Sequence, residues 1–243
     1  MKIQAKRGRR WLQWLRATFF HPAWLTNGVK RAPIPWLRCQ VRGRVLDIGA
    51  ADGLWRRYLS RDVSYLTLDY YQTAHDWYGT RPDVYGTAEQ LPFSLEQFDW
   101  VLLLNVMEHL PHPQSCVCEI LRVLKPGGRL LLQIPFLYPL HDVPLDFQRF
   151  TPYGLEVLAQ ENGFVVESTQ TLGHSVETAG LLLNIALSRC FLDLGIRRHP
   201  LFLLVPLVPV VVVMINLAVW CAAKILPSHP MICQGLLAVW KKP

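Results

Sequence analysis

The segment VLDIGAADG, residues 45–53, constrains the fold of this chain more than any other stretch. Its apolar start is typical of a short buried strand, which runs into a turn carrying Gly49 and Gly53 before a predicted helix. Because glycine lacks a Cβ atom, such a turn lets a ligand lie against backbone N–H groups at the start of a helix. The segment therefore predicts a strand–turn–helix unit of an α/β domain, with a ligand at the turn.

Two carboxylates and the glycine spacing narrow the chemistry of that ligand. The spacing is G-x-x-x-G, not the dinucleotide fingerprint G-x-G-x-x-G, so a nicotinamide oxidoreductase is disfavoured. Asp47 would repel a pyrophosphate but suits a ligand that carries an ammonium group. Asp69 ends the next predicted strand, where a carboxylate is either a turn residue or an acceptor for both ribose hydroxyls. Its position after the glycine turn favours the ribose role.

The rest of the chain alternates predicted strands and helices. Strands are expected at residues 44–48, 64–69, 84–86, 98–104, 129–134, 164–171 and 232–240, and helices at 53–60, 114–124 and 151–162. Pro126-Gly127-Gly128 stops the second helix, while Thr151 caps the third helix and Gly163 ends it. This series predicts a mostly parallel sheet with helices on both faces.

Taken together, these motifs resemble the class I S-adenosylmethionine-dependent methyltransferases, in the group that includes the ubiquinone/menaquinone-type enzymes. The motifs are VLDIGAADG, LTLDYY, GTAEQLPF, FDWVLLLNVMEHLPHP and EILRVLKPGGRLLLQIPF, which follow the family's order within residues 41–171. The resemblance implies a Rossmann-like, seven-stranded, mostly parallel sheet and S-adenosyl-L-methionine as the cofactor. It also implies that the last strand, residues 232–240, inserts antiparallel between the fifth and sixth strands.

The resemblance assigns cofactor contacts to eight positions. They are Asp47, Gly49, Ala51 and Gly53 beside the methionine part, Asp69 at the ribose, Ala88 and Glu89 beside the adenine, and Asn105 where cofactor and acceptor meet. Two positions depart from the family pattern. Ala51 replaces the middle glycine, and Thr87 stands where the family often has Asp. The second change implies weaker recognition of the adenine amino group.

Candidate catalytic residues follow two of the predicted strands. His109 lies in NVMEHL and is either a general base or a brace for its loop. His141, Asp142, Asp146 and Arg149 cluster in PLHDVPLDFQRFT, which resembles an H-D-x-P-x-D-x-x-R-x-T stretch of one subset of these methyltransferases. The cluster either lines the acceptor site or contains an Asp146–Arg149 salt bridge that holds a lid. No metal-ligand constellation is expected.

Basic residues are concentrated at the beginning of the chain. Residues 1–44 contain 11 Lys or Arg and no Asp or Glu, so the remainder carries 14 of the 25 basic residues and all 18 acidic ones. Aromatic residues alternate with these charges: Trp11, Trp14, Phe19, Phe20 and Trp24 are interspersed with Arg9, Arg10 and Arg16. This composition favours a membrane-surface segment over packing on the protein's own core, and it disfavours nucleic-acid binding. Since no long apolar run follows the charges, a secretory signal is not expected.

A second apolar feature lies near the other end. Residues 201–223 carry no charge and, as one helix, would span about 34 Å, enough for a bilayer core. A single crossing would leave the predicted strand at residues 232–240 on the far side of the membrane, away from its sheet. We therefore expect residues 201–226 to enter without crossing, bent at Pro206 and Pro209, with Asn216 and Lys224 toward the polar side. The alternatives are a soluble helical cap over the acceptor pocket and a single-pass anchor.

The sequence thus divides into a basic, aromatic-rich arm (1–40), a methyltransferase core (41–175), an apolar helical insertion (176–230) and a returning last strand (231–243). The predicted function is methyl transfer to a small-molecule or lipid-linked acceptor at the cytoplasmic face of a membrane. The alternative is a catalytically silent methyltransferase fold that serves as a binding or assembly subunit. The six cysteines show no zinc spacing and are expected to be reduced thiols.

Overall fold

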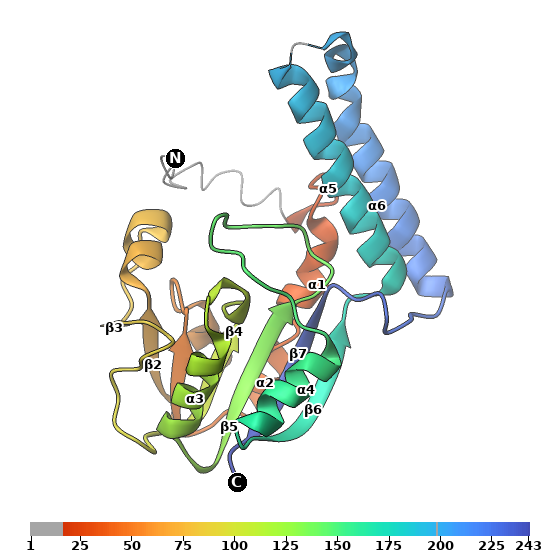
Figure 1. The fold of residues 1–243 in the computed structure, drawn as a ribbon. Helices are drawn as coiled ribbons and strands as arrows, with labels where there is room; N and C mark the ends of the chain where they lie inside the picture. The colour runs from red at the N-terminus through yellow and green to blue at the C-terminus, as the bar shows by residue number, and fades with distance from the viewer. Residues whose placement is uncertain (1–16, 198) are drawn as a thin grey trace.

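A computed structural model describes residues 17–197 and 199–243, and its centre is one twisted sheet (Figure 1). The sheet has seven strands in the order β3-β2-β1-β4-β5-β7-β6. The strands are β1 (Arg44–Ile48), β2 (Ser64–Asp69), β3 (Val84–Tyr85), β4 (Phe98–Leu104), β5 (Leu124–Pro135), β6 (Val165–Leu172) and β7 (Gly235–Lys241). Strand order reverses between β1 and β4, which creates a crevice at the carboxyl ends of the strands.

Pairing within the sheet confirms the predicted fold class. Strands β1 to β5 pair in parallel, whereas β7 runs antiparallel to both of its neighbours, β5 and β6. Residues Leu236–Trp240 of β7 are fully buried or nearly so, because helices cover both faces of the sheet at this position. The chain therefore returns to complete its own sheet after the apolar insertion, as the sequence predicts.

Two apolar clusters lie on opposite faces of the sheet, and β4 contributes to both. Val101 and Leu103 pack on one face beneath α3 (Pro113–Val123) and α4 (Pro152–Glu161). Leu102 and Leu104 pack on the other face, against Leu37 of α2 (Ile34–Cys39). The side chains alternate because successive residues of a strand point to opposite faces.

Local structure differs from the sequence prediction at three places. The helix expected at residues 53–60 is a short 3-10 helix, Leu54–Tyr58, in which Arg56 N–H bonds to Gly53 three residues back. Helix α3 ends at Val123, and β5 begins at Leu124, before Pro126-Gly127-Gly128, which forms a bulge within β5 where Gly127 and Gly128 bond to Lys242. An unpredicted π-helix, Gln72–Tyr78, follows β2.

The described part of the basic arm packs on the core. A 3-10 turn, Trp24–Thr26, and a short helix α1 (Asn27–Lys30) precede α2, and Leu25 and Leu37 are buried. Gln133 of β5 donates a hydrogen bond of 3.1 Å to the carbonyl of Val29. The predicted membrane contacts of Trp11, Trp14 and their neighbouring arginines lie outside the described residues.

The apolar insertion is a helical hairpin that projects away from the sheet (Figure 1). One arm is α5 (Ser175–Ile196), and the other continues from a 3-10 helix, Pro200–Leu207, into α6 (Val208–Ile225). The bases of the arms are joined by a 3.0 Å hydrogen bond between His174 Nε2 and the carbonyl of Leu226. Both arms are long and apolar enough to cross a membrane by length and composition.

The hairpin corrects the predicted position of the bend. The chain reverses between Arg197 and Pro200, not at Pro206 and Pro209. Pro209 lies in the first turn of α6, where a residue without an N–H group leaves no helical hydrogen bond unmade. The first arm of the hairpin, α5, was not recognised as a separate helix in the sequence analysis.

Asn216 also differs from the prediction, because it faces inward and not toward a polar surface. Its side chain is fully buried between the arms, where Asn184 Nδ2 donates to Asn216 Oδ1 at 2.9 Å. Asn216 Nδ2 in turn donates to the carbonyl of Phe19 at 2.7 Å. These bonds satisfy the buried amide of Asn216 and tie the hairpin to the N-terminal segment, whereas Asn184 Oδ1 has no hydrogen-bond partner among the described residues.

Candidate active site

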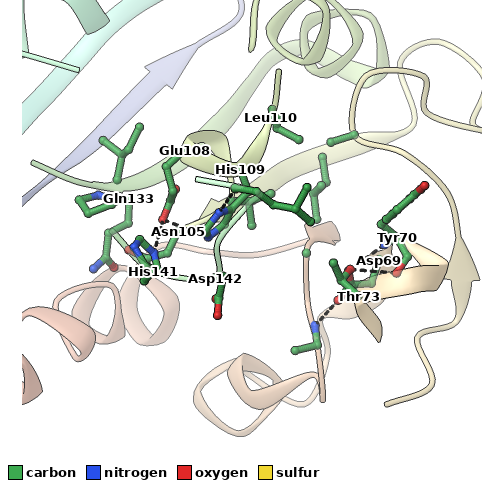
Figure 2. Close-up of a pocket in the computed structure, with 18 of the residues that line it drawn as sticks. Asp69, Tyr70, Thr73, Asn105, Glu108, His109, Leu110, Gln133, His141 and Asp142 are labelled. Carbon is green, nitrogen blue, oxygen red and sulfur yellow. Dashed lines mark hydrogen bonds and ion pairs between the residues drawn. The ribbon is translucent and has the colours of Figure 1, made fainter. Parts of the chain in front are cut away.

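A cavity of about 690 Å³ opens at the carboxyl ends of β1, β2, β4 and β5, where the strand order reverses. This volume lies within the range of cofactor and small-molecule sites. Three further segments close over it: the N-terminal turn at Thr26–Lys30, the π-helix Gln72–Tyr78 and the loop of residues 136–150. Figure 2 shows Asp69 on one wall of the cavity, and Glu108, His109 and His141 on another.

Asp69 is the best-defined polar group on the first wall. Its Oδ2 accepts a hydrogen bond of 2.8 Å from the N–H of Ala51, and its Oδ1 accepts one of 2.7 Å from the N–H of Tyr70. Thr73 Oγ1 donates to the same Oδ1 at 3.2 Å. These bonds fix the carboxylate at the end of β2 with one oxygen bound to the glycine turn, so turn and carboxylate form a single unit.

The turn at residues 49–53 owes its shape to three left-handed residues. Gly49, Ala51 and Gly53 all have positive φ angles, of +71°, +49° and +65°. A Cβ atom on Gly49 would overlap the side chain of Val106, so the loops after β1 and β4 approach closely only because this residue is glycine. Ala51 adopts the same backbone region at an energetic cost, since alanine is disfavoured there.

Asp47 lies beneath this turn and does not line the cavity. Its carboxyl group is buried and accepts a hydrogen bond from the hydroxyl of Tyr65. Burial raises the pKa of Asp47 to about 7, against the opposing effect of the Tyr65 hydrogen bond and with a further contribution from the charge of Asp69. Among the predicted cofactor residues, Asp47 and Gly53 are outside the cavity lining, whereas the other six belong to it.

The predicted adenine loop, with Thr87, Ala88 and Glu89, lines the cavity next to Asp69. The Thr87 hydroxyl accepts a 3.3 Å hydrogen bond from the Glu89 N–H, and Glu89 Oε1 accepts one of 2.8 Å from the N–H of His112. Ala88 is buried and offers an apolar surface. Opposite them, Asn105 has a φ angle of +58° at the end of β4. The set combines an apolar wall with polar groups at its edge, as a nucleoside requires.

A compact group of three ionisable side chains lies further along the cavity. Glu108 is fully buried, and its Oε1 is 3.8 Å from Nε2 of His109 and 3.7 Å from Nε2 of His141. His109 Nδ1 lies 2.5 Å from the carbonyl of Leu145, in the loop that covers the site. The structure thus brings together two predicted catalytic histidines from different loops, with a carboxylate between them.

The polar cluster of residues 141–149 divides into two parts. His141 and Asp142 line the cavity, and Tyr78 closes over it by donating a 3.0 Å hydrogen bond to Asp142. Asp146 and Arg149 lie outside the lining and form a two-pronged ion pair, with Nη2 2.8 Å from Oδ2. The predicted Asp146–Arg149 salt bridge is present and braces the loop, whereas the role of His141 and Asp142 at an acceptor site stays a prediction.

Charges in this loop shift two pKa values. Burial alone would raise the pKa of Asp146, but hydrogen bonds from Arg149 and from the His141 N–H hold it at about 2. Burial alone would lower the pKa of His141, yet the nearby Glu108, Asp146 and Asp142 carboxylates raise it above the usual value. His141 therefore lies in a strongly negative environment.

Sequence reasoning missed several residues at the site. Glu108 was treated only as part of an E-H pair, although a carboxylate that directly follows the apolar residues Val106 and Met107 could have indicated a buried charge. Tyr78 and Lys30 line the cavity from segments without a recognisable motif. Their placement depends on tertiary packing of the π-helix and the N-terminal turn, which no local pattern encodes.

Sequence comparison finds that the central strands of the chain are similar to a known family. The profile of the family described as "Methyltransferase domain" matches residues 46–132. Demethylmenaquinone methyltransferase of Tropheryma whipplei (strain Twist) is 29% identical over 139 residues, which are 54% of this chain and 57% of the relative. The ubiquinone/menaquinone biosynthesis C-methyltransferase UbiE of Haemophilus ducreyi is 32% identical over 90 residues, 37% of this chain and 34% of the relative. The chain thus spans about half or less of these curated relatives.

Structural comparison agrees at the level of the fold. A SAM-dependent methyltransferase from Archaeoglobus fulgidus superposes with a TM-score of 0.54 and 16% identity, over 96% of this chain and 100% of that chain. At this identity the likeness concerns the arrangement of strands and helices alone. The chemistry must be argued from the site.

Proposed function

Because the chain belongs to the class I S-adenosylmethionine-dependent methyltransferases, we propose that it transfers a methyl group from S-adenosylmethionine to a small-molecule or lipid-linked acceptor. The observation that carries the proposal is Asp69, held by Ala51 N–H at the junction of the glycine turn and the cavity. A carboxylate fixed there is suited to accept hydrogen bonds from ribose hydroxyls. The alternation of an apolar wall with polar edges supports the same ligand.

The residues of this chain fit the task of alignment. When bound, the cofactor supplies a methyl group with its leaving group already attached, so the protein chiefly positions the acceptor. Asp69 and the 49–53 turn hold one end, and Asn105 marks the point where the cavity continues toward His109 and His141. An oxygen or nitrogen acceptor placed between these histidines would find groups able to receive its proton.

The acceptor we favour is one that resides in or at a membrane. Each arm of the hairpin contains an apolar stretch of eighteen residues that qualifies it for membrane insertion. Only 17% of this stretch is buried within the protein in the first arm, and 11% in the second, so the apolar side chains face outward. None of the described hairpin residues is among those that line the cavity, which disfavours a cap over the acceptor pocket. Both ends of the hairpin meet at His174 and Leu226, so an inserted hairpin would enter and leave on the same side.

The test is methyl transfer from radiolabelled S-adenosylmethionine with the full chain and a total membrane extract. Label should enter the organic-soluble fraction, at a rate that falls at least tenfold when Asp142 is replaced by Asn. Label in protein or in water-soluble products alone would overturn the lipid or quinone-like acceptor. Cofactor binding without any transfer would favour the silent binding subunit instead.

A further inference from the structure

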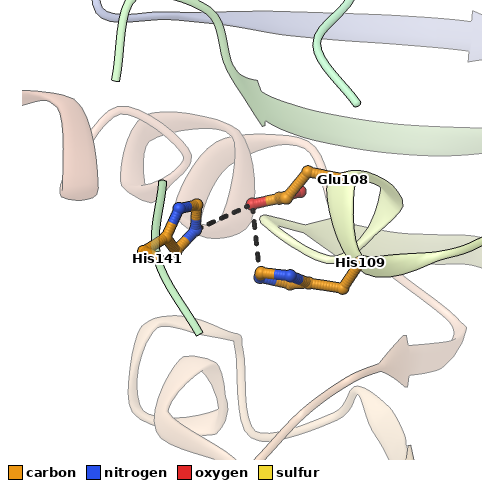
Figure 3. A group of neighbouring side chains, drawn as sticks. All are labelled: Glu108, His109 and His141. Carbon is orange, nitrogen blue, oxygen red and sulfur yellow. Dashed lines mark ion pairs between the residues drawn. The ribbon is translucent and has the colours of Figure 1, made fainter. Parts of the chain in front are cut away.

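Glu108 poses a chemical problem that the proposed methyl transfer does not solve. Its side chain is fully buried, and neither carboxylate oxygen has a hydrogen-bond partner among the described residues. A buried carboxylate without hydrogen bonds is strongly destabilising unless a positive charge neutralises it. The nearest ionisable groups are the two imidazoles of His109 and His141 (Figure 3).

In their neutral forms, both imidazoles would turn an Nε2 lone pair toward Glu108. His109 Nδ1 lies 2.5 Å from the carbonyl of Leu145, which only accepts, so Nδ1 must carry the proton. His141 Nδ1 lies 3.2 Å from Oδ2 of Asp146 and 3.3 Å from the carbonyl of Pro139, and both of these also accept. In neutral imidazoles Nε2 is then unprotonated, and each Nε2 points at Oε1 of Glu108.

From this convergence of three electron-pair donors, we propose that Glu108, His109 and His141 bind a divalent transition-metal ion of the zinc class. Their ligating atoms all lie within 4.8 Å of one another. Two histidines with one glutamate form the ligand set of catalytic zinc sites that keep a position open. Metal-bound histidines typically donate their other N–H to a carbonyl or carboxylate, as Leu145 and Asp146 accept here.

Closing the site onto an ion requires a small movement. Ligand atoms at about 2.0–2.2 Å from a tetrahedral zinc ion are separated from one another by roughly 3.3–3.6 Å. The two Nε2–Oε1 distances of 3.8 and 3.7 Å lie slightly above this range. Both imidazoles line the cavity, which leaves space on one side of each ring for this small adjustment.

The open coordination position would face the cavity, where the acceptor is proposed to bind. With the ion bound, the histidines would be its ligands and no longer free bases; a hydroxyl oxygen bound to the ion would lose its proton more easily, because a metal ion lowers the pKa of the groups it binds. The metal site itself is argued from the side chains alone. It therefore stands or falls independently of methyl transfer.

The experiment uses the full chain, freed of metal with a chelator and with its exposed cysteines alkylated. Titration with Co²⁺ should give one equivalent of tight binding and a visible d–d absorption band, and Zn²⁺ should displace it and raise the melting temperature. Glu108→Gln and His141→Asn should each weaken binding at least about 100-fold. His75→Ala, a change at an exposed histidine that does not belong to the cavity lining, should bind as the wild type does.

Two results would overturn the metal site. The first is a folded wild-type protein that gives no cobalt band, and the second is equal affinity in His141→Asn and wild type. If Glu108→Gln fails to fold, His141→Asn still decides, because that side chain is partly exposed. A protonated His141 could also balance the charge of Glu108. If NMR spectra show an imidazolium signal for His141 that stays unchanged when Zn²⁺ is added, that proton and not a metal ion balances the charge.

Discussion

Ala51 occupies a backbone conformation that alanine disfavours, at the point where the turn contacts Asp69. Its φ angle is +49°, and a non-glycine residue in this region costs about 1–2 kcal/mol. Ala51→Gly should therefore raise the free energy of unfolding by about 0.5–1 kcal/mol after allowing for the greater freedom of glycine in the unfolded chain. Thermal unfolding is the measurement.

The control for this change lies two residues earlier. Gly49 has a φ angle of +71°, and a Cβ atom there would overlap Val106. Gly49→Ala should accordingly lower the melting temperature, while Ala51→Gly raises it. If both substitutions lower it, the left-handed cost at Ala51 is offset by contacts of its methyl group, and the account of this turn is wrong.

The raised pKa of Asp47 leads to a prediction of how the free energy of unfolding depends on pH. Its pKa is raised from 3.8 to about 7 by burial, so between these values the folded chain holds a proton that the unfolded chain has released. The contribution of Asp47 to stability is therefore full below pH 4, falls as pH rises through 7, and is constant above. Relative to Asp47→Asn, the unfolding free energy of the wild type should drop by on the order of 2–4 kcal/mol over that window. Denaturant unfolding at a series of pH values measures it, and parallel profiles would contradict the assignment.

At the scale of elements, the loop of residues 136–150 depends on one ion pair. Asp146 has a side chain only 1% exposed, and Arg149 contacts both of its oxygens. Arg149→Ala leaves that carboxylate without its partner, and it should cost about 1–3 kcal/mol and reduce turnover more than tenfold. Affinity for the cofactor should change less than threefold, because the pair is remote from Asp69.

A matched control exists for this ion pair. Arg129 forms a similar two-pronged pair with Glu167 on the sheet surface, with Nε 2.7 Å from Oε2. Arg129→Ala should leave turnover near the wild-type rate, since exposed pairs contribute little. Equal loss of activity in both variants would mean that turnover reports overall stability and not the shape of the loop.

The hairpin makes a prediction of its own. Leu203 and Met214 are 83% and 65% exposed, so each would lie in lipid if the hairpin inserts. Replacing both by Lys should weaken binding to anionic vesicles by more than about 100-fold, because a lysine at depth costs roughly 2.5–3.5 kcal/mol. Vesicle flotation is the measurement, with Tyr153→Lys on α4 as an exposed control. Unchanged flotation of the double variant would leave the hairpin outside the membrane.

At the scale of the whole molecule, local sequence patterns were sufficient to predict a strand or helix where its burial was uniform. Strands β4 and β7 were predicted because both of their faces are covered, which gives nearly unbroken apolar runs. Thr151 and Gly163 marked the ends of α4 because caps are local. The antiparallel insertion of the last strand between the fifth and sixth came from the family resemblance, and the pairing of β7 with β5 and β6 confirms it.

Long-range packing was beyond those patterns. Helix α5 was not distinguished because Arg189 and Asp193 interrupt its apolar sequence, and its pairing with α6 depends on Asn184 and Asn216, 32 positions apart. Similarly, Leu25 and Leu37 pack on the core from a segment whose charge suggested a surface role. At the site, the meeting of Glu108 with His141 joins two loops that only the folded sheet brings together.

The central claim is that the cavity beside Asp69 binds S-adenosylmethionine, and calorimetric titration of the purified full chain tests it most directly. The wild type should bind both the cofactor and its demethylated product. Asp69→Ala should weaken binding by about 1.5–3 kcal/mol, or roughly 10–150-fold, and Asp69→Asn should lie between the two. Asp62→Asn, at an exposed carboxylate on the surface, should match the wild type. No heat at millimolar cofactor from a folded sample, or equal affinity in Asp69→Ala and wild type, would contradict the account.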